Sequence, residues 1–219
     1  MRNGARLYTS ARFQLMAASM LFPTARFLVG AHQPAQFPDD HGAEVAFAGR
    51  SNAGKSSALN AIAARQSLAR TSKTPGRTQQ VNFFELRPGC RVVDLPGYGF
   101  AKAPPDLIRH WQALLDAYFV RRRSLRGVVQ VMDIRHPLTD YDVQLIEFAN
   151  QSAVPVHVLL TKADKLSRSQ AQQVLKQVRA ALEGATVQLF SAQDKTGVDE
   201  ARKALEALWS AAQEADPPQ

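Results

Sequence analysis

A glycine-framed run of eight residues has the side chains and the backbone freedom needed to hold phosphate. It follows an apolar stretch at residues 44–48 and reads Gly49-Arg50-Ser51-Asn52-Ala53-Gly54-Lys55-Ser56. The glycines let the backbone curl so that its N–H groups face an anion. The lysine places a cation on the β- and γ-phosphates of a nucleotide, and the serine offers a hydroxyl to Mg²⁺. The run therefore predicts a nucleotide-phosphate site with Mg²⁺ as cofactor.

A second run directly follows another apolar stretch and reads Asp94-Leu95-Pro96-Gly97. Its carboxylate can hold the magnesium shell, as the aspartate at the end of a neighbouring strand does in P-loop enzymes. The backbone N–H of the glycine can donate to the γ-phosphate. Alone, this pattern is a common turn, so its value comes from its place downstream of the phosphate-binding run.

Two further runs could recognise a base, and each again comes directly after an apolar stretch: Thr161-Lys162-Ala163-Asp164 and Phe190-Ser191-Ala192. The carboxylate of the first can accept from N1–H and the 2-amino group of guanine together, a donor pair that adenine lacks. The lysine stem can pack along the base. A backbone N–H at Ala192 can contact guanine O6. Together, in this order, the motifs predict GTP rather than ATP as the ligand.

The elements that position these motifs are expected to alternate between strand and helix. Apolar runs predict strands at 44–48, 81–86, 90–94, 128–133, 154–160 and 186–190, and helical spacing predicts helices at 55–64, 106–119, 141–150, 169–183 and 198–212. Such alternation is typical of a mainly parallel sheet covered on both faces, with ligands at the carboxyl ends of the strands. We therefore expect a P-loop GTPase (Ras-like) three-layer α/β/α fold, with one antiparallel strand from the hairpin at 81–94.

The length of 219 residues fits one globular domain with additional terminal segments. We expect an N-terminal extension with an edge strand at residues 1–42, the GTPase domain at 43–212 and a flexible tail at 213–219. Within the extension, residues 25–29 could form that strand.

The chain is basic, with a formal net charge of +8. A basic surface favours anionic partners such as nucleic acid, although a solvated basic surface with no dedicated partner has the same composition. The single cysteine excludes an intrachain disulfide and fits a reducing compartment. No stretch reaches the roughly 18 apolar residues that a membrane-spanning helix needs.

The first two dozen residues resemble a weak secretory signal, because arginines precede an apolar run at residues 13–22. Gln14 and Ser19 interrupt that run, and Arg26 follows shortly after it. We therefore expect a short amphipathic segment, no stable membrane insertion and a cytoplasmic location, where the nucleotide is found.

The chain resembles the bacterial EngB (YihA/YsxC) family of the TrmE-Era-EngA-EngB-septin-like GTPase superfamily from about residue 25 to about residue 209. Besides the P-loop, the matching strings are Ser72-Lys73-Thr74-Pro75-Gly76-Arg77-Thr78-Gln79, Val81-Asn82-Phe83-Phe84, Asp94-Leu95-Pro96-Gly97-Tyr98-Gly99-Phe100-Ala101 and Thr161-Lys162-Ala163-Asp164. The strings Thr74-Pro75-Gly76-Arg77-Thr78-Gln79 and Pro96-Gly97-Tyr98-Gly99-Phe100-Ala101 are more specific to the family than the P-loop is.

The resemblance implies a cytoplasmic GTPase that assists assembly of the large (50S) ribosomal subunit and is necessary for normal cell division and septation. Its expected partners are GTP and ribosomal RNA or a large-subunit precursor, and we expect a monomer. The resemblance also implies that Thr78 joins Ser56 on Mg²⁺. The segment that closes over the γ-phosphate would then consist of Gly76, Arg77, Thr78, Gln79 and Gln80. The implied catalytic residues are Lys55, Thr78 and Gly97.

The sequence departs from Ras-like enzymes at one position. Those enzymes place a water-orienting glutamine just after the second motif, where this chain has Tyr98. Slow hydrolysis by the isolated protein is therefore expected, with stimulation by a partner or an ion. Asn52 in the P-loop suggests a potassium ion near the phosphates, as in related GTPases.

Other interpretations stay open at this point. The chain could be an RNA-binding module with a structural nucleotide site, a tRNA-modification or metal-transport GTPase domain, or a nucleotide kinase. Arg77 could act as an arginine finger or lie solvated in its loop. The cluster at residues 121–123 and Arg126 could contact ribosomal RNA phosphate, or could be a charged helix end.

Overall fold

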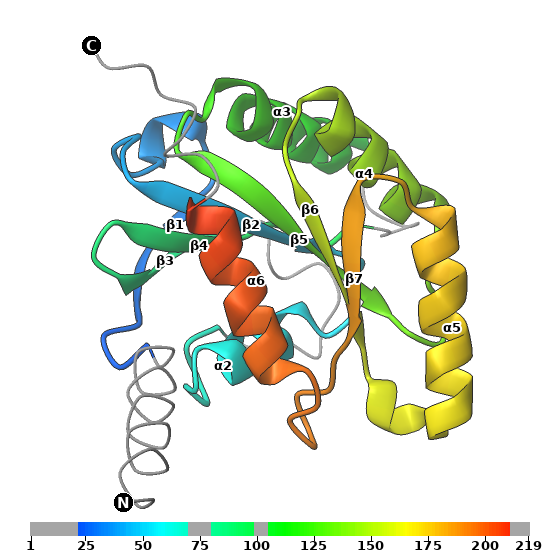
Figure 1. The fold of residues 1–219 in the computed structure, drawn as a ribbon. Coiled ribbons are helices and arrows are strands. Elements are labelled where there is room, and N and C mark those ends of the chain that lie inside the picture. Colours follow the sequence, from blue (N-terminus) through cyan, green and yellow to red (C-terminus); the bar gives the residue numbers. More distant parts are fainter. Residues whose placement is uncertain (1–21, 70–79, 99–104, 211–219) are drawn as a thin grey trace, which may run out of the picture.

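The computed structural model describes residues 22–69, 80–98 and 105–210, and within these ranges the chain forms a seven-stranded sheet in the order β1-β3-β4-β2-β5-β6-β7 (Figure 1). The strands are β1 (Arg26–Ala31), β2 (Ala43–Gly49), β3 (Val81–Arg87), β4 (Cys90–Asp94), β5 (Leu125–Asp133), β6 (Val156–Thr161) and β7 (Ala185–Leu189).

Among these described strands, β3 alone runs against the others. It pairs antiparallel with both β1 and β4, whereas β4, β2, β5, β6 and β7 pair in parallel. The predicted mostly parallel sheet with one antiparallel strand is therefore confirmed. Every residue of β6 is buried, as expected for a strand covered on both faces.

Helices cover the two faces of the sheet in separate layers (Figure 1). Helices α3, α4 and α5 contribute to one apolar core, and α2 and α6 contribute to the other. This arrangement confirms the predicted three-layer α/β/α fold. The bounds are α2 (Lys55–Ile62), α3 (Pro105–Arg121), α4 (Asp140–Gln151), α5 (Arg168–Ala181) and α6 (Val198–Ser210), with 3₁₀ turns η1 (Pro34–Gln36) and η2 (Ala163–Lys165).

The edge strand β1 lies beside the β3–β4 hairpin. Its Phe27 ring packs edge-on against Phe84 at 5.5 Å between centroids, and the Thr24 hydroxyl donates to the Leu86 carbonyl at 3.2 Å. These contacts join the segment before residue 43 to the same sheet as the phosphate-binding motif. The division at residues 42 and 212 stays a prediction.

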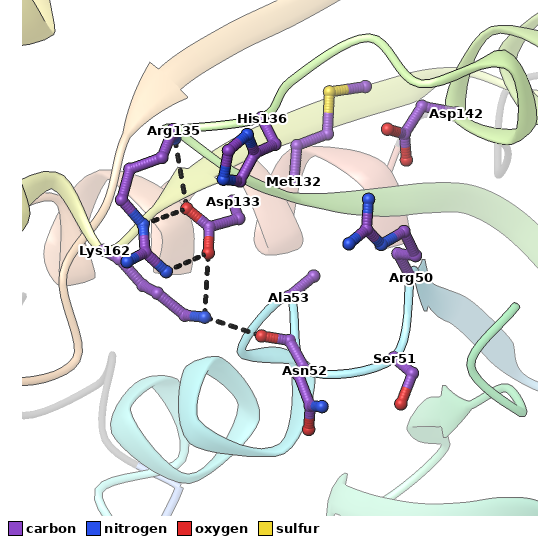
Figure 2. Close-up of a pocket in the computed structure, with 10 residues that line it drawn as sticks. All are labelled: Arg50, Ser51, Asn52, Ala53, Met132, Asp133, Arg135, His136, Asp142 and Lys162. Carbon is purple, nitrogen blue, oxygen red and sulfur yellow. Dashed lines mark hydrogen bonds and ion pairs between the residues drawn. The ribbon is translucent and has the colours of Figure 1, made fainter. Parts of the chain in front are cut away.

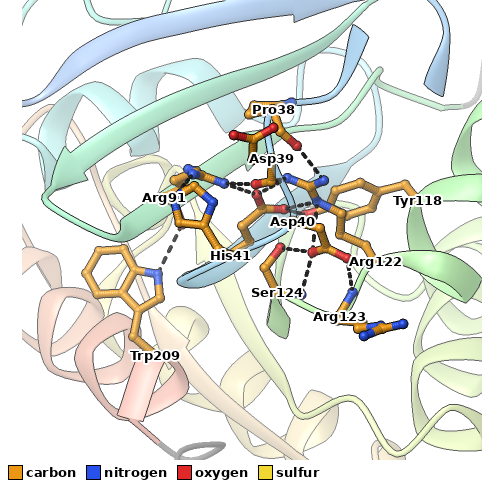
Figure 3. A network of polar contacts seen from close by, with 11 residues as sticks. Pro38, Asp39, Asp40, His41, Arg91, Tyr118, Arg122, Arg123, Ser124 and Trp209 are labelled. Carbon is orange, nitrogen blue, oxygen red and sulfur yellow. Dashed lines mark hydrogen bonds and ion pairs between the residues drawn. The ribbon is translucent and has the colours of Figure 1, made fainter. Parts of the chain in front are cut away.

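A buried cluster of charges lies at the amino-terminal end of β2, opposite the motif-bearing edge (Figure 3). Glu44 has no exposed surface and accepts from Arg91 at 3.0 Å and from Arg122 at 2.7 Å. Tyr118 also donates to its carboxylate, at 3.2 Å. The cluster therefore ties the end of α3 to β2 and β4.

The central arginine of the basic cluster at residues 121–123 turns inward and is not available to contact RNA phosphate. The side chain of Arg122 is 6% exposed and also donates to the Pro38 carbonyl at 2.7 Å. Its guanidinium neutralises the carboxylate of buried Glu44, and leaving that carboxylate unpaired would strongly destabilise the fold. Only Arg121 and Arg123 of the three remain exposed.

Within the described ranges, no helix is both long enough and apolar enough to cross a bilayer.

Candidate functional site

The phosphate-binding run forms the loop between β2 and α2. Its Gly54 has φ = 101°, a left-handed conformation that favours glycine, and directly precedes the helix. The amide of Ala58 donates to the Gly54 carbonyl at 2.8 Å, so the helix starts at Lys55. The free N–H groups of this first helical turn point back into the loop, where an anion would lie.

The second motif packs directly against this loop. The Ser51 amide donates to the Tyr98 carbonyl at 3.0 Å. A Cβ atom on Gly97 would lie 3.2 Å from Ser51 Cα, and one on Gly49 would lie 2.5 Å from the Val131 carbonyl oxygen. Gly49 therefore has no room for a side chain, and a side chain on Gly97 would force the loop backbone to shift.

The charged groups of the first two motifs meet at the base of the loop. The Lys55 ammonium donates to a carboxylate oxygen of Asp94, and their side chains are 10% and 6% exposed. The neighbouring Leu95 is buried, and its amide donates to the Phe47 carbonyl at 3.0 Å. The end of β4 is therefore fixed beside β2.

The third motif contacts the opposite side of the loop (Figure 2). The Thr161 hydroxyl lies between the carbonyl oxygens of Ala53 and Met132, 2.9 Å from the latter, and donates to them. Lys162 has φ = 59°, and its ammonium donates to the Asn52 carbonyl at 2.7 Å. The end of β6 is thereby attached to the P-loop.

The third and fourth motifs also touch each other. The Ser191 hydroxyl donates to Asp164 at 2.7 Å, and the Ala163 amide donates to the Phe190 carbonyl at 3.1 Å. The Ser191 hydrogen bond holds the pKa of Asp164 below its usual value, so the side chain is a carboxylate at neutral pH. An ionised acceptor is what recognition of two guanine donors requires.

Part of the predicted site falls outside the described residues. Gly76, Arg77, Thr78 and Gln79 belong to this group, so the role of Thr78 on Mg²⁺ stays a prediction. Gln80 is described, and its amide nitrogen lies 2.5 Å from a ring nitrogen of His32, next to the edge strand.

Four residues that the sequence analysis did not assign lie near the P-loop: Asp133, Arg135, His136 and Asp142. They line a pocket of about 190 Å³ together with residues 50–53, Met132 and Lys162 (Figure 2). Asp133 ends an apolar strand just as Asp94 does, and that position is the signal by which the sequence could have revealed it.

Tyr98, which stands where Ras-like enzymes have a water-orienting glutamine, has its hydroxyl bound to another side chain. Its hydroxyl donates to Asp142 at 2.6 Å, and the same carboxylate oxygen accepts from Gln130 at 2.9 Å. Burial, followed by the charge of Asp142, raises the pKa of Tyr98 far above its usual value. The hydroxyl therefore stays neutral and remains hydrogen-bonded to Asp142 of α4.

The residues at the head of α2 fit a magnesium ion. The described part of the chain has no group of three or more His, Cys, Asp and Glu side chains that could hold a metal alone. Ser56, in the first turn of α2, and Asp94, beside Lys55, offer oxygen atoms only. Mg²⁺ prefers such ligands, and it takes few from the protein when phosphates and water supply the rest.

A family model described as "50S ribosome-binding GTPase" matches residues 44–162, which is more than half of the chain. The protein of Stenotrophomonas maltophilia named "Probable GTP-binding protein EngB" is 60% identical over 189 residues, covering 84% of this chain and 94% of the relative. A protein of the same name from Xanthomonas oryzae pv. oryzae is 56% identical, covering 84% and 91%.

Solved structures show the same fold. The crystal structure of a protein titled as a GTP-binding protein engB superposes with a TM-score of 0.64 at 21% identity, covering 77% of this chain and 100% of that one. A GTP-binding protein of Sulfolobus solfataricus, solved in complex with GDP, gives 0.52 at 18% identity, covering 77% and 53%.

The extent of the sequence matches confirms the resemblance first based on the P-loop and the strings around Thr78 and Asp94. The chain therefore belongs to the EngB family of GTP-binding proteins and is a GTPase with the P-loop fold.

Proposed function

We propose that this protein is a switch that hydrolyses GTP with Mg²⁺ and assists assembly of the large (50S) ribosomal subunit in the cytoplasm. The observation that carries the nucleotide part is that the second and third motifs contact the P-loop and the fourth contacts the third, with the Asp164 carboxylate accepting from Ser191 at the base-recognising end. The ribosomal part is supported by the matching family, described as "50S ribosome-binding GTPase". A role in cell division and septation would follow from ribosome assembly.

In this proposal the nucleotide lies across the carboxyl edge of the sheet. Backbone N–H groups of residues 49–56 and the Lys55 ammonium bind the phosphates. Lys162 lies along the base, Asp164 accepts from its N1–H and 2-amino group, and the Ala192 amide contacts O6. Phe190 is fully buried and anchors this last loop.

Ser56 and Asp94 would hold the magnesium ion, the aspartate through its shell, with Thr78 joining when the preceding segment closes. When bound, Mg²⁺ neutralises charge on the β- and γ-phosphates. The contact between Lys55 and Asp94 supports this arrangement, because it brings the lysine and the expected magnesium-shell carboxylate together at the base of the P-loop.

Hydrolysis consists of attack by water on the γ-phosphorus and departure of the β-phosphate oxygen. The protein contributes positioning and charge: Lys55 neutralises phosphate oxygens, and the Gly97 amide donates to the γ-phosphate. Tyr98 cannot orient the water, since its hydroxyl is bound to Asp142. The isolated protein is therefore a slow GTPase, and we propose that a partner, or a potassium ion near Asn52, accelerates it.

The γ-phosphate would set the conformation of residues 74–80 and 94–101, and the GTP form of a monomer would bind the ribosomal precursor. This can be tested by co-sedimentation of the purified protein with separated ribosomal subunits at several salt concentrations. GDP is compared with a non-hydrolysable GTP analogue.

We expect binding to the large subunit only with the GTP analogue, persisting as salt rises. A second candidate function, non-specific RNA binding, is favoured by the charge of +8. Equal binding to both subunits with either nucleotide, lost at modest salt, would favour that candidate and contradict the ribosome-assembly proposal.

A further inference from the structure

Two carboxylates flank the P-loop at the ends of the strands on either side of β2. The sheet order places β4 on one side of β2 and β5 on the other. Asp94 ends β4 and binds the Lys55 ammonium, whereas Asp133 ends β5 and binds the Lys162 ammonium. Each lysine of the nucleotide site is thus paired with the carboxylate of a neighbouring strand end.

The contacts of Asp133 fix its carboxylate from two sides (Figure 2). One oxygen accepts from the Arg135 amide at 3.1 Å and from its Nε at 2.9 Å. The other accepts from Arg135 Nη2 at 2.7 Å and from Lys162 Nζ at 2.9 Å. Burial opposes ionisation here, but the hydrogen bonds from Arg135 and Lys162 outweigh it and hold the pKa of Asp133 well below its usual range.

Lys162 needs such a partner because its long side chain is otherwise weakly restrained. Its side chain is 31% exposed, and within the described residues its ammonium contacts the Asn52 carbonyl and Asp133. Ordering a free lysine side chain costs rotamer entropy. A carboxylate that pins the ammonium removes that cost before a nucleotide arrives.

We propose that Asp133, oriented by Arg135, is a positioning residue for guanine-nucleotide binding: it holds Lys162 against the P-loop and thereby fixes the wall along which the base lies. The inference rests on the proposed nucleotide site. Asp133 touches neither base nor phosphate in this arrangement and acts through Lys162. It sets how tightly the nucleotide is held, whereas Asp164 sets which base is chosen.

The direction in which nucleotide affinity changes distinguishes this proposal from a purely electrostatic effect of the Asp133 charge. Asp133 brings a negative charge close to a site for polyanionic phosphates, so removing the charge alone would tighten binding. Loss of the Lys162 restraint has the opposite effect. Asp133→Asn keeps an oxygen for the Arg135 amide but removes the charge that attracts Lys162. Its effect on nucleotide affinity therefore shows which of the two effects is larger.

The test measures equilibrium and dissociation kinetics of a fluorescent GDP derivative on the full chain. For Asp133→Asn we expect affinity to fall roughly 10-fold, as for loss of one hydrogen bond to a charged group, chiefly through faster dissociation. The preference for GDP over ADP is retained. Asp199→Asn is the matched control, because it removes a carboxylate that binds Arg202 at 2.8 Å on α6, and we expect unchanged affinity.

A double-mutant cycle shows whether Asp133 acts through Lys162. In a Lys162→Ala background, Asp133→Asn is expected to have little further effect, whereas a merely structural role gives additive losses. Arg135→Gln, which removes an exposed partner, should weaken binding in the same direction but less. It also keeps the proposal testable if thermal melting shows that Asp133→Asn is unfolded.

Unchanged or tighter GDP binding by folded Asp133→Asn would overturn the positioning role while leaving the nucleotide site intact. Additive losses in the cycle would do the same. Failure of the unmodified protein to bind GDP at all would instead overturn the proposed function itself.

Discussion

At the scale of single residues, the site depends on pairs that the sequence presents far apart. The Ser191-Ala192 dipeptide carries almost no signal by itself, yet the serine hydroxyl binds the carboxylate that would recognise guanine. The sequence predicted the identity of the chemical groups, because their types and order are specific. It could not predict the role of Asp133, because its partner Lys162 is recognisable only when β5 and β6 lie side by side.

Asp164→Asn should shift the base preference from guanine toward xanthine. An amide at this position offers a donor in place of one acceptor, and xanthine carries a carbonyl oxygen where guanine carries the 2-amino group. Competition between GDP and XDP for the purified variant measures the shift. Unaltered guanine selectivity would show that Asp164 does not recognise the base.

Lys55→Ala should abolish tight nucleotide binding, with a loss of roughly 100-fold or more, because charge-assisted contacts to the phosphates disappear. Calorimetric titration with GDP measures the loss. Lys176→Ala, on α5, is a suitable control. If Lys55→Ala bound GDP as tightly as the unmodified chain, this lysine would not lie at the phosphates.

At the scale of elements, the order and type of strands and helices follow from the sequence because buried parallel strands are continuous apolar runs. The bounds were less accurate: β5 begins at Leu125 rather than at residue 128, where the apolar run starts. The buried cluster around Glu44 was not predicted. Its partners Arg91 and Arg122 are 47 and 78 residues away in the chain, and nothing local marks an arginine that turns inward.

Glu44→Ala should destabilise the fold by about 3–5 kcal/mol, since two largely buried guanidinium groups lose their carboxylate. Chemical denaturation measures the change. Glu85→Ala is the matched control: it removes a 2.7 Å pair with an Arg26 side chain that is 66% exposed, and it should cost less than about 1 kcal/mol. Equal effects of the two substitutions would contradict the structural role of the buried cluster.

The pairing of β6 with β7 should depend on pH through His157. Its Nε2 lies 2.9 Å from Gln188 and its Nδ1 lies 2.7 Å from Thr186, and burial lowers the pKa of His157. The unfolded chain then binds this proton more readily than the folded chain does. The contribution of His157 to the free energy of unfolding is therefore constant above about pH 6.5 and decreases as pH drops below it.

Thermal melts between pH 7.5 and 5.5 check this expectation. In His157→Asn the fall over this range should be smaller than in the unmodified chain. An identical fall in both proteins would assign the pH dependence to other groups.

At the scale of the whole molecule, three layers bring the motifs to one edge of the sheet and leave a buried ion cluster at the other. Parallel strands all end at the same edge, which is why motifs placed after strands could be predicted to converge. The contacts between those motifs could not, because they depend on side-chain directions that arise only when the sheet is assembled. The segments with Thr78 and Gly99 lie outside the described residues, so their response to the γ-phosphate remains a prediction.

The most direct test of a slow GTPase at this site is single-turnover phosphate release from GTP and from ATP, with Mg²⁺, by the unmodified protein and by Lys55→Ala. The structure leads us to expect slow release from GTP, none above background from ATP, and none with the variant. Equal rates with GTP and ATP, or full activity of Lys55→Ala, would contradict guanine-specific hydrolysis at the P-loop.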